Sequence, residues 1–242
     1  MQNRHHRYRY YDLVITGFVT VLLCSNLIGP GKVCQLDLPF RVPFIGDQLI
    51  FGAGNIFFPI GFIFGDILTE VYGYARARRA IWAGFGAMIF ATLMTSTILN
   101  LPAKPDEPYN AVLQPALETA FGNTWRIVIA SLLAYWLGDF ANSYVLARMK
   151  VWSKGKWLWT RTIGSTIVGQ GVDSILFYPI AFGGLWTGDS MWAAVAFNFT
   201  FKVMIEVLAT PLTYAAVGFL KRAEREDYFD TRTDFNPFTL RD

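Results

Sequence analysis

Long stretches without a charged residue constrain this chain more than any other feature. Three such runs, residues 13–31, 48–65 and 80–103, contain no Asp, Glu, Lys or Arg at all. Three further runs are interrupted by only one or two charges, and they are residues 127–147, 162–188 and 190–220. An α-helix needs about 20 mostly apolar residues to cross the hydrocarbon core of a bilayer. The sequence therefore predicts an all-α integral membrane protein with six transmembrane helices.

The composition excludes several other classes of protein. Only 16% of the residues are charged and 53% are hydrophobic, whereas about 25% of a typical soluble chain is charged. An ordinary soluble enzyme and a disordered chain are both excluded on this ground. The net charge of +3 is too small to indicate a nucleic-acid partner. We expect one transmembrane domain at residues 1–222 and a short cytoplasmic tail at residues 223–242.

The distribution of basic residues predicts the orientation. Most of the 21 Lys and Arg residues lie before the first span, after the last one, or in the segments that follow the second and fourth spans. Basic residues concentrate on the cytoplasmic side of bacterial membrane proteins. We therefore expect both termini to be cytoplasmic. The opposite segments, residues 32–47 and 102–118, contain several prolines and are predicted to be outer loops.

A few ionisable and amide side chains remain inside the predicted spans. Such groups are costly in a membrane, so they usually face the interior of the bundle and mark a site or a pathway. Their spacing of three or four residues places them on one face within each helix. They are Asp66 and Glu70, Asp139 and Asn142, Gln170 and Asp173, and Lys202 and Glu206.

Each of these faces also has a structural interpretation. Lys202 and Glu206 are four residues apart and suited to neutralise one another. Small residues between 162 and 173 are suited to close helix packing. Asp66 and Glu70 are near enough to the basic segment 76–79 to pair with Arg76 or Arg79. Four polar faces on four different helices nevertheless favour a polar cavity within the bundle.

Several segments resemble the bacterial queuosine precursor transporter family, which belongs to the vitamin uptake transporter group. The resemblance rests mainly on residues 58–85, which include the unusual sequence Asp-Ile-Leu-Thr-Glu-Val-Tyr-Gly at 66–73. Residues 157–174 and 202–214 agree with it, as do Ser25 and Asn26 in the first span. The segment 138–143 departs from the pattern that the family shows there.

The resemblance implies a transporter of the bacterial inner membrane that imports the 7-deazaguanine bases preQ0 and preQ1. It also implies a fold similar to the substrate-binding subunits of energy-coupling factor vitamin transporters. A carboxylate can accept two adjacent N–H donors of a guanine-like edge. We therefore predict that Asp173 or Glu206 binds this edge, that Gln170 and Asn26 complete the polar contacts, and that Lys202 keeps a buried carboxylate ionised.

The remaining polar residues are assigned to gating or coupling, with a proton as one candidate for the coupling ion. These residues are Asp66, Glu70, Arg79, Asp139 and Asn142. A homo-oligomer is compatible with the sequence. We expect no metal and no cofactor, because no CxxC motif or His–Cys cluster is present.

Two classes of transporter remain in competition. The first is a secondary transporter that works alone, and the second is a binding subunit that needs a separate ATP-driven module. Such subunits carry an Ala-xxx-Ala pattern in their first helix, whereas residues 13–29 contain no alanine, which favours the first class. A membrane enzyme would require a nucleophile with a base, or a metal cluster, and the sequence indicates neither.

Overall fold

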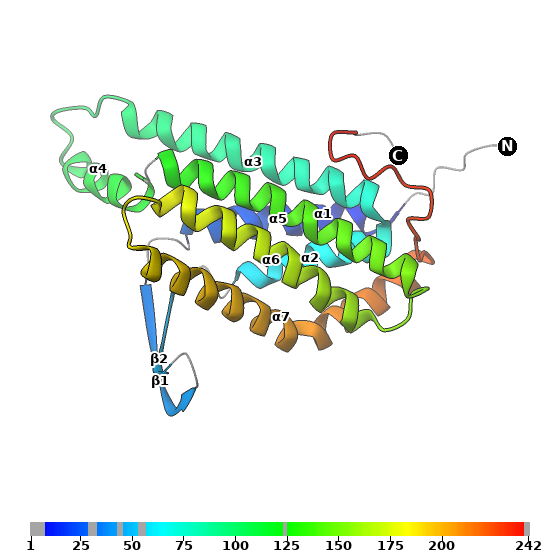
Figure 1. Ribbon diagram of the computed structural model, residues 1–242. Helices are drawn as coiled ribbons and strands as arrows, with labels where there is room; N and C mark the ends of the chain where they lie inside the picture. The colour runs from blue at the N-terminus through cyan, green and yellow to red at the C-terminus, as the bar shows by residue number, and fades with distance from the viewer. Residues whose placement is uncertain (1–7, 29–32, 43–45, 53–56, 123–124, 240–242) are drawn as a thin grey trace.

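The apolar runs of the sequence form long helices that pack side by side in the computed structural model (Figure 1). The structure describes residues 8–28, 33–42, 46–52, 57–122 and 125–239. The helices are α1 (Tyr11–Ile28), α2 (Phe58–Ile67), the π-helix η2 (Leu68–Tyr72), α3 (Tyr74–Asn100), α4 (Pro108–Phe121), α5 (Trp125–Trp152), α6 (Leu158–Phe182) and α7 (Gly188–Glu224). An antiparallel hairpin of β1 (Val33–Val42) and β2 (Gly46–Gly52) projects from one end of the bundle (Figure 1).

The second apolar run does not form one continuous helix, which corrects the prediction for residues 48–65. Its first residues belong to β2, and α2 begins only at Phe58. Gly52 disfavours a helix here, and Ile50 and Phe51 before it suit a strand. Pro59 lies in the first turn of α2, where its missing N–H costs nothing.

The two predicted outer loops also contain regular structure. Residues 33–42 form β1, and α4 occupies most of the proline-rich segment 102–118. Pro108 begins α4, and the Glu107 side chain caps it by accepting a hydrogen bond from the Tyr109 amide. Helix capping and proline at the first helical position explain why this proline-rich segment folds as a helix.

The exposed and buried surfaces are arranged as in a protein surrounded by lipid. Large apolar side chains cover the outside of the bundle, for example Phe90 and Leu93 on α3 and Leu208 and Leu212 on α7, which are all more than 60% exposed. Charged and amide side chains lie inside it. This is the reverse of the distribution in a soluble protein, where charged residues are almost never fully buried.

Within the part of the chain that the structure describes, two helices, α3 and the part of α7 from Met191 to Glu224, are long and apolar enough to cross a membrane by length and composition. Helices α5 and α6 are also long but contain more polar residues, and α1 and α2 are shorter. The structure therefore agrees with a helical membrane protein. The count of six spans stays a prediction.

The described part of the tail packs against one end of the bundle instead of leaving it. Asp230 accepts a hydrogen bond from the Tyr74 amide at the start of α3, and Arg78 donates to the carbonyls of Asp234 and Asn236. At the same end, Glu224 accepts hydrogen bonds from the amides of residues 9 and 10, before α1. The beginnings of α1 and α3 and the end of α7 thus meet at this tail end. Residues 1–7 and 240–242 lie outside the described residues.

The junction between η2 and α3 depends on Gly73. Its φ angle of +87° lies in the region that favours glycine, and a Cβ atom would come within 2.3 Å of the Tyr228 ring. The tail therefore packs directly on the turn that follows the π-helix. π-Helical turns are rare in proteins, and those that occur are often found at functional sites.

Candidate functional site

Seven polar side chains from four elements meet inside the bundle and form what we call the central polar cluster. Helix α2 contributes one, α5 two, α6 two and α7 two, and they are Asp66, Asp139, Asn142, Gln170, Asp173, Lys202 and Glu206. Close packing of α5 against α6 holds part of this cluster together. A Cβ atom on Gly169 would lie 2.8 Å from Cβ of Asn142 and 3.0 Å from the Gly138 carbonyl oxygen. The small residues therefore serve packing and also place polar neighbours side by side.

An ion pair joins α6 to α7 within this cluster. The ammonium of Lys202 donates to Oδ2 of Asp173 over 2.7 Å, and both side chains are 11% exposed. Lys202 therefore pairs with a carboxylate on the neighbouring helix, and not simply with Glu206 one turn away. Asp139 on α5 is half-buried and close enough to interact electrostatically with both partners.

A second pair of carboxylates lies deeper and has a different environment. Asp66 and Glu206 are 0% and 1% exposed and interact electrostatically across α2 and α7. The amide of Asn142 donates to Oδ1 of Asp66 over 2.9 Å. Oδ2 of Asp66 and both carboxylate oxygens of Glu206 have no hydrogen-bond partner among the described residues.

Further buried polar atoms near these helices lack a partner within the described part of the chain. They are the hydroxyls of Ser25, Thr166 and Ser174 and the amide oxygens of Asn142 and Gln170. Buried polar groups are normally hydrogen-bonded, so each exception needs an explanation. A polar ligand in contact with these atoms would supply the missing partners.

Two of the site residues predicted from the sequence, Asn26 and Arg79, do not belong to the central polar cluster. Asn26 is half-buried on α1, and its amide donates back to the Leu22 carbonyl in the same helix. Arg79 lies in the first turns of α3 and is exposed. The segment 76–79 is thus helical, and Arg76 donates to the Tyr72 carbonyl and stacks over the Tyr8 ring.

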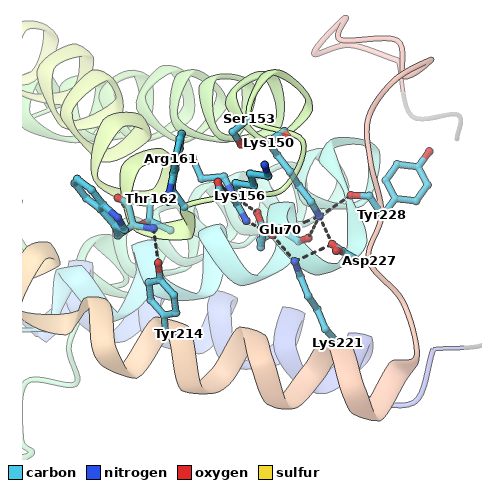
Figure 2. Close-up of polar contacts among 12 residues, drawn as sticks. Glu70, Lys150, Ser153, Lys156, Arg161, Thr162, Tyr214, Lys221, Asp227 and Tyr228 are labelled. Atoms are coloured by element: carbon cyan, nitrogen blue, oxygen red, sulfur yellow. Dashed lines mark hydrogen bonds and ion pairs between the residues drawn. The ribbon is translucent and has the colours of Figure 1, made fainter.

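Figure 2 shows that Glu70 is the centre of a separate ionic cluster at the tail end of the bundle. Its carboxylate accepts two hydrogen bonds of 2.8 Å from Arg161 and one of 2.5 Å from Lys221. The ammonium of Lys150 lies 3.4 Å from Oε1 of Glu70 and donates to its backbone carbonyl over 2.6 Å. We call these residues, together with Asp227, the Glu70 cluster.

Asp227 connects the tail to this cluster. Its Oδ1 lies 2.6 Å from Nζ of Lys150 and 2.7 Å from Nζ of Lys221. Burial alone would raise the pKa of the Asp227 carboxyl, but the hydrogen bonds from the two lysines outweigh burial and lower the pKa below its usual value. The Glu70 cluster therefore binds the tail to α5, η2 and α7 through ionised groups (Figure 2).

Sequence reasoning identified Glu70 but missed the cations around it. Lys150, Arg161 and Lys221 lie just outside the predicted spans, where basic residues are expected for the topology alone. Asp227 belongs to a tail with many charges of both signs. Nothing in the pattern distinguishes these four residues from their charged neighbours.

Comparisons with known proteins agree with the resemblance seen in the sequence. The family described as "Putative vitamin uptake transporter" matches residues 52–216. A protein of Bacillus subtilis (strain 168) named "Probable queuosine precursor transporter" is 32% identical over 201 residues, which cover 82% of this chain and 85% of that protein. The "Queuosine precursor transporter" of Escherichia coli (strain K12) is 29% identical over 180 residues, or 72% of this chain and 73% of its own length. No solved structure matches.

Proposed function

Because the chain belongs to the vitamin uptake transporter family, and is therefore a membrane transporter and not an enzyme, we propose that it imports queuosine precursors. The proposed substrates are the 7-deazaguanine bases preQ0 and preQ1, and the proposed mode is secondary transport across the bacterial inner membrane. The names of the similar proteins support the substrate class. The observation that carries the proposal is the central polar cluster, which lies inside a bundle whose outer surface is apolar.

The Asp173–Lys202 pair is the proposed centre of the substrate site. The ammonium of Lys202 lies 2.7 Å from Oδ2 of Asp173, and a carboxylate has about four lone-pair positions for acceptance. One oxygen can therefore keep its bond to Lys202 while the carboxylate accepts N–H groups from a guanine-like edge. Asp173 is a better acceptor for a base than Glu206, because it is 8% exposed whereas Glu206 is sealed at 1%.

Two amide side chains complete the proposed contacts. Gln170 lies one turn before Asp173 on α6 and has an unpartnered buried oxygen among the described residues. Asn26 on α1 is half-buried. An amide provides both donors and acceptors, which suits the carbonyl and ring nitrogen beside the donor edge of the base. Glu206 closes the inner side of this site.

The proposed topology has six membrane-spanning segments with both termini in the cytoplasm and a fold similar to the energy-coupling factor binding subunits. The spans are α1, α2 with η2, α3, α5, α6 and α7. In this orientation the Glu70 cluster lies at the cytoplasmic end and acts as the gate. Asp66, Asp139 and Asn142 lie between the gate and the substrate site and couple the two, and Arg79 flanks the gate on α3.

Uptake by the purified protein in liposomes tests the proposal. We expect labelled preQ0 or preQ1 to accumulate without ATP or any second protein, and we expect Asp173→Asn to reduce uptake roughly tenfold or more, since a charged hydrogen-bond acceptor is lost. Asp189→Asn, an exposed carboxylate at the start of α7, is the matched control and keeps full uptake. Uptake only after addition of an ATP-driven module would instead support the binding-subunit alternative.

A further inference from the structure

Asp66 and Glu206 are two buried acidic side chains that interact electrostatically, and neither forms an ion pair with a cation among the described residues. Neither Oδ2 of Asp66 nor either oxygen of Glu206 accepts a hydrogen bond from the described residues. Asn142 is 2% exposed and directs its amide at Asp66, while its own Oδ1 is also unpartnered among the described residues. Four buried oxygens on three interacting side chains therefore lack a donor among the described residues.

The charges on the surrounding elements do not neutralise this pair. Glu70 on η2 and Asp139 on α5 add negative charge to the surroundings of Asp66. Glu70 is engaged with the three cations of its own cluster. Lys202, one turn before Glu206 on α7, makes its ion pair with Asp173 on α6. Two adjacent carboxylates in apolar surroundings cannot both stay ionised without a compensating positive charge.

We propose that Asp66 and Glu206, with the amide oxygen of Asn142, bind one monovalent cation, either a proton or Na⁺. The two carboxylates are less than 2% exposed, so a cation bound to them is shielded from solvent. Oxygen ligands of this kind suit a hard cation. The cation site is thus separate from the more exposed Asp173–Lys202 pair.

The position of the pair suggests how cation binding and transport are linked. Asp66 lies in the last turn of α2, which continues into η2 with Glu70, and Glu206 shares α7 with Lys202 of the proposed substrate site. A cation bound to Asp66 and Glu206 would thus affect both the Glu70 cluster, through η2, and the substrate site, through α7. This link rests on the proposed transport function, whereas the binding of the cation does not.

Thermal melting of the purified full-length protein in detergent, without substrate, tests the binding. One arm varies pH in choline chloride, and the other replaces choline chloride by NaCl at constant pH and ionic strength. We expect the melting temperature to rise by roughly 5–10 °C in one of the two arms, which is the effect of a ligand near saturation. Asp66→Asn and Glu206→Gln should each lose this rise, and Asp189→Asn should retain it.

A variant that keeps the carboxyl group separates loss of cation binding from a folding defect. Glu206→Asp retains a carboxylate and should keep a reduced cation response even where Glu206→Gln expresses poorly. In the proton arm, the infrared band of a protonated carboxyl group should weaken in Asp66→Asn and in Glu206→Gln. A melting temperature that responds equally in wild type and all variants, or that responds to neither cation, would overturn the proposal.

Transport measurements separate this inference from the proposed function. If the cation response is present but no base is taken up by the liposomes, the transport function fails and the cation site stands. If bases are taken up at the same rate with and without proton and Na⁺ gradients, the link between the site and transport is wrong.

Discussion

Glu70 is fully buried and contacts three cations, of which Lys150 and Arg161 are at most 2% exposed. Removal of its charge in Glu70→Gln leaves the buried Arg161 without its carboxylate partner and leaves Lys150 and Lys221 with Asp227 alone, and breaking a buried ion pair typically costs about 3–5 kcal/mol. We expect a clear fall in the melting temperature of the purified protein. Glu118→Gln, an exposed change of the same kind on α4, serves as the control. Equal melting temperatures for the two variants would contradict the role of Glu70.

Asp227 makes the contribution of the tail to the stability of the fold depend on pH. Its pKa in the folded protein lies below the usual value, because hydrogen bonds from the two lysines outweigh burial. The carboxylate therefore stabilises the fold above its unfolded pKa of about 3.9, and this contribution is lost as the pH falls through the lower folded value.

The measurement compares wild type with Asp227→Asn. We expect the variant to melt at a lower temperature at pH 7 and the two proteins to converge in acid. The pKa of Asp230 is raised by burial, against the hydrogen bond from Thr233, and shifts stability in the opposite direction, but it does so in both proteins. A difference that stays constant over the whole pH range would show that Asp227 acts through its shape and not through its charge.

The sequence predicts which residues of the central polar cluster are unusual, but not how they pair. Charge within an apolar run identified Asp173, Lys202 and Glu206 without any structure. The spacing along α7 left a pair of Lys202 with Glu206 as one alternative, whereas Lys202 forms an ion pair with Asp173 on α6. Pairing between helices depends on their rotation and depth, and these are determined by packing that a single sequence does not encode locally.

At the scale of elements, hydropathy predicts long helices well and short segments poorly. Residues 48–52 are as apolar as the helix that follows, yet they form β2 because β1 supplies a pairing strand. The prolines in and before α4 led to the prediction of a loop, although Pro108 in fact begins the helix. Both predictions were wrong because they rested on the composition of a segment. The position of each residue within its helix or strand determines the structure instead.

The contact between α5 and α6 depends on the absence of side chains at Gly138 and Gly169. Gly169→Ala would place a methyl group 2.8 Å from Cβ of Asn142, so the helices must separate at a cost of about 1–3 kcal/mol. Gly218→Ala on α7 has nothing within 4 Å of the new atom and is the matched control, since alanine only improves helix propensity there. We expect a lower melting temperature for the first variant and an equal or higher one for the second.

Displacement of Asn142 in Gly169→Ala should also reach the site. Asn142 holds Asp66 by a hydrogen bond of 2.9 Å, so the melting response to protons or Na⁺ should weaken in Gly169→Ala and persist in Gly218→Ala. A full response in Gly169→Ala would mean that Asn142 does not organise the carboxylate pair.

In the whole molecule, the two polar clusters occupy different depths of one bundle. The Glu70 cluster binds the tail, η2, α5 and α7 at one end, while the central polar cluster lies further inside between α2, α5, α6 and α7. In the proposed orientation, the Glu70 cluster lies between the proposed substrate site and the cytoplasm, which is the place of a cytoplasmic gate.

The orientation of the whole bundle in the membrane decides whether the Glu70 cluster is a cytoplasmic gate. The β1–β2 hairpin and the connection between α5 and α6 lie at opposite ends of the bundle (Figure 1). The hairpin carries the exposed Gln35 and the connection carries the exposed Lys156. Single cysteines at these positions, in a chain with Cys24→Ser and Cys34→Ser, report the accessible side. Arg232→Cys in the tail, also exposed, is a second marker for the tail end.

We expect a thiol reagent that cannot cross the inner membrane to label Gln35→Cys in spheroplasts. Lys156→Cys and Arg232→Cys should react only after the membrane is disrupted, because the basic residues around them favour the cytoplasm. Labelling of all three positions from outside would exclude a closed gate at the tail end, and the reverse pattern would place that end outside the cell. In either case the Glu70 cluster would have to be reassigned, since its role as the cytoplasmic gate follows from this orientation.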